Sequence, residues 1–137
     1  MLYFRGEIRR ITIGGTCILS SIYGAVRDRN WGTVPYRIRN ESIQISKHGF
    51  KISTELEYKA ADIRFVARER IEGKGNQLTF SFQGRAESPF LKNRIGLCIL
   101  HPVKECKGKA VEVRHMDGTA TSGTFPVAIS PHQPFRN

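Results

Sequence analysis

Apolar and polar residues alternate with a period of two along most of this chain, which is typical of half-buried β-strands. Turn signals separate the alternating segments: Gly14-Gly15, Lys47-His48-Gly49, Glu72–Asn76 and Asp117-Gly118. Strands recur about every ten residues, and no stretch has a convincing helical period. The pattern predicts an all-β fold, an antiparallel two-sheet β-sandwich, with a barrel or half of a larger sandwich as the alternatives. The predicted strands lie within residues 2–13, 16–23, 35–46, 50–58, 63–70, 78–84, 95–100, 111–115 and 119–125.

One segment departs from this alternation. Ile95–Leu100 contains only Ile, Leu, Cys and Gly, which predicts a central strand covered on both faces. A helix is the competing interpretation, but Gly96 and Pro102 disfavour it. Such a strand carries polar groups only at its ends, so we expect Arg94 and His101 at a pocket or surface.

The composition is that of one globular domain of 137 residues. No apolar run approaches the roughly 18 residues of a membrane span, and Met1–Arg10 lacks the apolar stretch of a signal peptide. We therefore expect no membrane association and a cytoplasmic location. The 3 cysteines are an odd number, which favours reduced, buried thiols over a disulfide framework.

The formal net charge of +10 raises nucleic acid as a partner. The basic residues are spread along the chain, however, and neither a run of five like charges nor an aromatic RNA-binding motif is present. Nucleic-acid binding is therefore disfavoured. The alternatives are solvated strand faces with a few arginines reserved for an acidic small molecule or another domain, and a fragment whose missing part balances the charge.

Residues 25–33 hold a dense polar segment that ends near the single tryptophan of the sequence. On a strand, Arg27 and Arg29 would share a face and form a fork for a carboxylate, and Trp31 would offer a flat surface to a sugar or lactone ring. With Arg94, these residues are the predicted substrate-binding set. The alternative is a loop locked by an internal Arg–Asp pair, with Trp31 buried in the core.

His101 and Glu105 are the candidate acid–base pair, at the end of the apolar strand. Cys98, His101 and Cys106 resemble a metal-ligand set, but residues three apart on a strand point to opposite faces. We therefore expect no metal and no cofactor. A phosphate-binding glycine loop, a Gly-x-Ser-x-Gly elbow and a His-Glu-x-x-His motif are absent from the sequence, so no catalytic constellation stands on its own.

The end of the chain differs from the rest. Residues 1–125 form the predicted sandwich domain, whereas residues 126–137 are rich in proline, as in an extended connector. This connector leads toward a missing domain or folds back over the sheet, and it carries His132.

Three segments, residues 25–33, 90–106 and 125–135, resemble the amino-terminal domain of the D-apionate lactonase family. The resemblance spans nearly the whole chain and implies a β-domain that precedes a TIM barrel in a sugar-lactone hydrolase of carbohydrate catabolism. Because barrel enzymes place their chemistry at the barrel strand ends, it also implies an accessory domain that is inactive alone, whose catalytic residues are unknown.

The partners implied by this resemblance are a sugar lactone or sugar acid and the missing TIM-barrel domain. Residue type and position suggest that Arg27, Arg29 or Arg94 binds the product carboxylate and that His101 or Glu105 handles a proton. The rival hypothesis is a non-catalytic carbohydrate-binding or domain-docking β-sandwich module.

Overall fold

The computed structural model describes residues 1–128, and most of them form antiparallel strands. The short helix α1 (Val103–Cys106) interrupts the strands near the end of this region. The strands are β1 (Leu2–Phe4), β2 (Glu7–Ile13), β3 (Thr16–Asp28), β4 (Tyr36–Ser46), β5 (Gly49–Ala60), β6 (Ile63–Lys74), β7 (Gln77–Ala86), β8 (Lys92–Leu100), β9 (Ala110–Arg114) and β10 (Ala120–Thr124).

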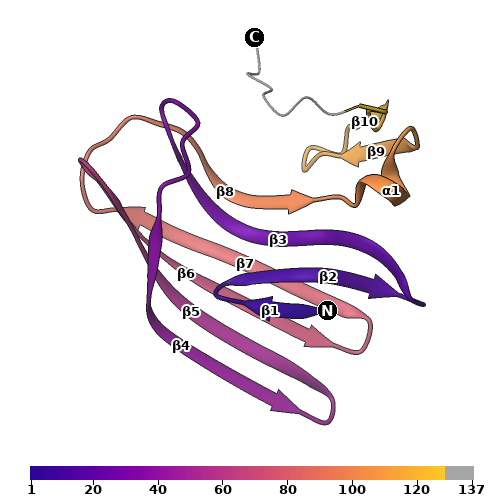
Figure 1. Cartoon of the computed structure of the whole chain (residues 1–137), viewed down its shortest axis with the longest axis horizontal. Coiled ribbons are helices and arrows are strands. Elements are labelled where there is room, and N and C mark those ends of the chain that lie inside the picture. Colours follow the sequence, from indigo (N-terminus) through magenta and orange to yellow (C-terminus); the bar gives the residue numbers. More distant parts are fainter. Residues whose placement is uncertain (129–137) are drawn as a thin grey trace.

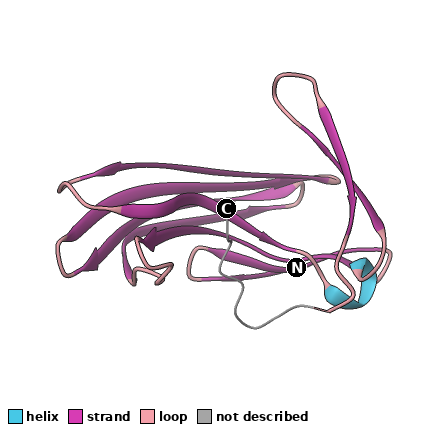
Figure 2. Cartoon of the chain, turned by 90° about the horizontal axis from the view of Figure 1, so that it is seen from above, coloured by secondary structure: helices cyan, strands magenta, loops and turns pink. Residues whose placement is uncertain are grey.

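The strands form two facing sheets and one separate hairpin. The first sheet has the order β1-β2-β3-β8, the second β4-β5-β6-β7, and β9 and β10 form the hairpin (Figure 1). Seen from above, the strands lie in two layers with α1 at one end of the molecule (Figure 2). The predicted all-β antiparallel sandwich is confirmed.

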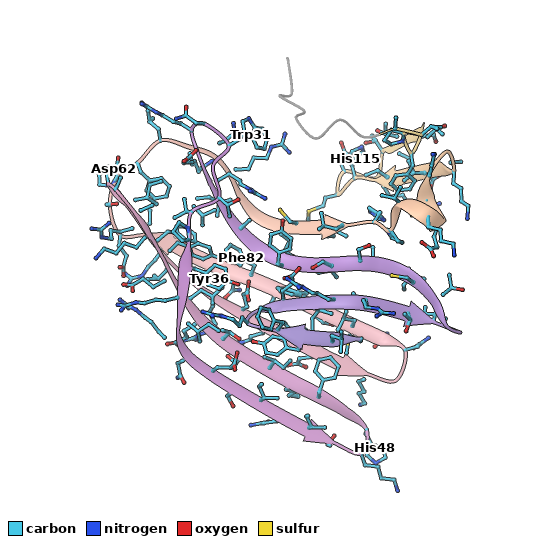
Figure 3. The ribbon with its side chains drawn as sticks, in the orientation of Figure 1. Trp31, Tyr36, His48, Asp62, Phe82 and His115 are labelled. Carbon is cyan, nitrogen blue, oxygen red and sulfur yellow. The ribbon has the colours of Figure 1, made fainter. Side chains whose placement is uncertain are left out.

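The core lies between the two sheets because each sheet turns its apolar residues inward. In β6, for example, Ile63, Phe65 and Ala67 are buried, and their neighbours in sequence are more exposed, as the period of two requires. Figure 3 shows Tyr36 and Phe82 near the middle of the molecule, where both pack on this core. A second, smaller core cluster joins the two sheets near the other end of β5 and β6. It consists of Ile8, Ile52 and Ile71.

The prediction for Ile95–Leu100 is confirmed as to strand but wrong as to position. These residues belong to β8, which within residues 1–128 pairs only with β3 and forms one edge of the first sheet. Ile95 packs on the core, whereas Leu97 and Ile99 on the same face are 41% and 51% exposed. Apolar composition reports how well a strand tolerates burial, but the order of strands in a sheet is decided by long-range pairing.

Three further differences concern local structure. Residues 2–13 form two strands, because Arg5 and Gly6 both have positive φ (48° and 85°) and close a two-residue turn. The helix α1 was not expected from the sequence. Of the predicted connector, residues 129–137, including His132, lie outside the described residues. In the described part, no helix has the length and apolarity needed to cross a membrane.

Candidate functional site

The polar segment after β3 folds into a turn held by one carboxylate. Asp28 Oδ1 accepts hydrogen bonds from the backbone N–H groups of Asn30 and Gly32, both at 2.8 Å. The alternative interpretation, a loop locked by internal contacts of the aspartate, is therefore correct in outline. The partners of the aspartate are backbone amides, however, and not the arginine that was expected. Because β3 ends at Asp28, the prediction that Arg27 and Arg29 share a strand face is wrong: Arg29 lies exposed in the turn.

The turn brings Trp31 to β8. The Arg94 guanidinium carbon lies 5.6 Å from the centroid of the Trp31 ring, within the range of a cation–π interaction. Trp31 is 37% exposed, so its interpretation as a core residue is wrong. Figure 3 shows it above the loop end of β3. Two of the predicted binding residues, separated by more than sixty positions in sequence, are therefore neighbours.

Arg27 lies on the same outer face. Val26 and Ile95 are paired and both pack in the core, so their neighbours Arg27 and Arg94 point to the opposite side of the sheet. Arg27 Nη1 donates to Thr33 Oγ1, and Arg27 Nη2 donates to the Tyr23 hydroxyl at 3.4 Å. We call Tyr23, Arg27, Trp31 and Arg94 the outer-face cluster.

A thiol lies beside this cluster. Cys98 pairs with Tyr23 across β3 and β8, and the pKa of the Tyr23 hydroxyl is raised, first by burial and then by Cys98. The cluster thus combines two guanidiniums, a phenol and an indole on one side of the first sheet. This arrangement suits a ligand with a carboxylate and a ring.

The predicted acid–base pair is not assembled within the described residues. His101 follows the end of β8 and packs on Phe125, with ring centroids 5.0 Å apart. Glu105 lies on α1, and no hydrogen bond or ion pair links it to His101 in residues 1–128. Cys98 and Cys106 are free thiols, and no group of three or more His, Cys, Asp or Glu side chains in that range has the arrangement of a metal site.

Sequence reasoning missed a buried carboxyl group in the core. Glu69 in β6 is 1% exposed, and its Oε1 accepts the Gly24 backbone N–H at 3.1 Å across the two sheets. Its Oε2 has no hydrogen-bond partner among the described residues. Burial raises the pKa of Glu69 to about 7 because the apolar surroundings disfavour the charged form. The alternation of β6 contained the signal, since it places Glu69 on the same face as Ala67 and Ile71.

Polar groups around Glu69 tie the sheets together. The Tyr58 hydroxyl donates to the Gly24 carbonyl at 3.2 Å. The Tyr3 hydroxyl donates to Glu41 and lies 3.1 Å from Thr54 Oγ1, and burial is the main reason that the pKa of Tyr3 rises to about 12. These contacts give the region a structural role, because they join β1 and β3 to the facing sheet.

The outer face of the second sheet gathers arginines, but glutamates accompany them. Arg37 and Arg39 both bind Glu57, and Arg68 lies 2.7 Å from Glu55. These ion pairs partly neutralise a face that would otherwise attract polyanions. A shallow hollow of about 420 Å³ lies among these charges.

The fold and the clusters define an all-β domain that carries polar binding groups but, in residues 1–128, no assembled catalytic set. Comparison with known proteins gives the family: the profile of the D-apionate lactonase N-terminal domain matches residues 1–137. The chain belongs to this family, as its three motifs predicted.

A curated relative gives the extent of the match. The D-apionate lactonase of Brucella anthropi is 34% identical to this chain over 134 residues, which cover 96% of this chain and 22% of that protein. The chain thus spans less than a quarter of the length of its relative, as an amino-terminal accessory domain of a lactonase-like protein. No solved structure is significantly similar to it.

Proposed function

We propose that this domain assists the hydrolysis of a sugar lactone by the longer protein of which it is the amino-terminal part, and that it is inactive alone. The family membership supports the proposal. Lactone hydrolysis needs an activated water and donors for the oxyanion that forms at the carbonyl. The described residues contain no such assembled set, so we assign these groups to the rest of the protein, a TIM barrel by the resemblance of the sequence.

The outer-face cluster supplies the domain's contribution. Opening of a lactone produces a carboxylate and a hydroxyl group, and the guanidiniums of Arg27 and Arg94 are suited to the carboxylate. The Trp31 ring is suited to the apolar face of the sugar. Arg29 lies in the turn after β3, so it remains a candidate for carboxylate binding only if the turn moves. His101 and Glu105 remain separate candidates for handling a proton, because no hydrogen bond or ion pair joins them within residues 1–128.

The test uses the full-length protein and the lactone of D-apionate, with acid release followed in a pH-stat. The Arg94→Met variant is expected to lower kcat/KM about tenfold or more, chiefly through kcat, because the negative charge that the guanidinium binds develops only as the lactone opens. The control is Arg85→Met, on the outer face of the second sheet. Unchanged turnover of the Arg94→Met variant would contradict the proposed role of the cluster. A full-length protein without lactonase activity would contradict the proposed function itself.

The rival function is a carbohydrate-binding or domain-docking module that takes no part in catalysis. It is favoured if the Arg94→Met variant retains full kcat/KM with a soluble lactone but loses retention on an immobilised sugar acid. A cytoplasmic location also belongs to the proposal, because the thiols Cys17, Cys98 and Cys106 are free, as suits a reducing compartment.

A further inference from the structure

The edge of the first sheet carries a patch of exposed apolar side chains, formed by Leu97, Ile99 and Leu100 of β8 and Val103 of α1. Their exposed fractions are 41%, 51%, 46% and 54%. Ile99, Leu100 and Val103 line one hollow of about 470 Å³, and Leu97 lies two residues before Ile99 on the same face of β8. Contiguous apolar surface of this kind marks an interaction site. We call these four residues the β8 patch.

The composition of β8 is that of a strand covered by other structure. Ile95–Leu100 has no charged residue, although among residues 1–128 β8 is an edge strand with one side of its backbone unpaired. Edge strands that face water are usually protected by charges or polar residues. The edge strand β4 also exposes Ile43 and Ile45. It nevertheless fits that rule, because it carries the exposed charges of Arg37, Arg39 and Glu41. The mismatch at β8 indicates that structure other than residues 1–128 covers this strand.

The charges around the β8 patch restrict what the cover is. Lys92 and Arg94 precede the patch, and Lys104 and Lys107 follow it, in a chain with a formal net charge of +10. A second copy of this domain would bring the same basic rim to the contact, and like charges across an interface oppose association. A surface with an apolar centre and an acidic rim is complementary.

We propose that the rest of the longer protein packs on the β8 patch through an apolar surface rimmed by acidic residues. The proposal rests on the proposed function only in taking this chain to be the amino-terminal part of a longer protein. That premise has direct support, because the matched region makes up 22% of the Brucella anthropi relative. Covering β8 completes the burial that its sequence is suited to and offsets the charge of the domain.

The experiment measures thiol labelling in the full-length protein under native conditions, resolved by peptide mass spectrometry. The Ile99→Cys variant probes the patch, and the matched Ile45→Cys variant probes the edge strand β4, where Ile45 is 83% exposed. Position 99 is expected to label at least tenfold more slowly than position 45. A rate at position 99 within threefold of that at position 45 overturns the proposal.

Hydrogen exchange of the unsubstituted full-length protein keeps the test valid if a variant fails to fold. The backbone amides of β8 that do not bond to β3 are expected to exchange more slowly than the amides of the edge strand β4 that do not bond to β5. Equal rates overturn the proposal. Protection that is lost on dilution to the monomer means that a second copy is the cover. Equal protection of position 99 in residues 1–137 alone means that this chain covers itself. Either result overturns the proposal.

Lactone turnover measured on the same sample separates the two claims. Slow labelling at position 99 in a protein without lactonase activity rejects the proposed function and supports the docking surface. Fast labelling in an active lactonase rejects the docking surface and leaves the function standing.

Discussion

The Glu69 carboxylate accepts a hydrogen bond from the Gly24 backbone N–H at 3.1 Å and thereby joins β6 of the second sheet to β3 of the first. The other carboxylate oxygen is buried without a hydrogen-bond partner among the described residues. A buried, half-satisfied acid is costly when it ionises, so this contact makes the stability of the sandwich depend on pH.

The first prediction concerns that dependence. The pKa of Glu69 rises from its usual 4.5 to about 7 on folding, so the folded state holds a proton that the unfolded state has released. Stability is therefore full below pH 4.5 and falls as pH rises through 7, by a total of about 3 kcal/mol. Urea unfolding at pH 5 and pH 8 measures the difference. The Glu69→Gln variant, which has no such proton, is expected to lose most of this slope, and an unchanged slope would contradict the assignment.

The second prediction concerns the space at Gly24. A Cβ added there would lie 2.4 Å from Glu69 Oε1 and from the Phe82 ring, so Gly24→Ala forces the sheets apart. Overpacking of this kind costs about 1–3 kcal/mol. The control is Gly123→Ala in β10, whose Cβ would meet Val111 at an ordinary 3.9 Å. Thermal melting compares the two, and equal melting temperatures would show that the sheets adapt to the methyl group.

The third prediction concerns the turn that positions Trp31. Asp28→Ala removes the acceptor of two backbone hydrogen bonds and is expected to cost about 1–2 kcal/mol, whereas Asp28→Asn keeps a carbonyl oxygen at that place. Since Trp31 is the single tryptophan, its fluorescence reports the turn directly. A red shift is expected for Asp28→Ala and not for Asp28→Asn; identical spectra would show that the turn does not need the acceptor.

The fourth prediction concerns acid. Hydrogen bonds from Arg37, and then from Arg39, hold the pKa of Glu57 below its usual value. A lowered folded-state pKa means that Glu57 contributes stability above its usual pKa, and that the contribution is lost as pH falls through the folded value. Glu57→Gln is expected to reduce the loss of stability between pH 5 and pH 3. Glu72→Gln, which removes a single 3.6 Å pair with Lys51, serves as the control with a smaller effect expected.

Much of the fold was predictable, because the alternation of β4 to β7 is local information that each strand carries in its own residues. The two-sheet arrangement followed from these strands and the turn signals between them. The turn at Arg5-Gly6 was missed, because an arginine rarely adopts a positive φ and the sequence therefore gives no turn signal there. The helix α1 was missed because a single turn shows no period.

The candidate site was predictable only in part. Residue chemistry selected Arg27, Trp31 and Arg94, and the family motifs selected the segments that contain them. The contact between Arg94 and Trp31 depends on the pairing of β3 with β8, which no local pattern contains. The prediction for Arg29 assumed that the strand continues through it, but β3 ends at Asp28, one residue earlier.

The sequence by itself determined that this protein is a sandwich of alternating strands and a member of the D-apionate lactonase N-terminal family, because periodicity and motifs are properties of consecutive residues. Only the tertiary structure decided that Ile95–Leu100 is an edge and that Glu69 lies between the sheets with one oxygen unsatisfied. Burial and strand pairing depend on residues far apart in the chain, so they are established only when the two sheets pack together.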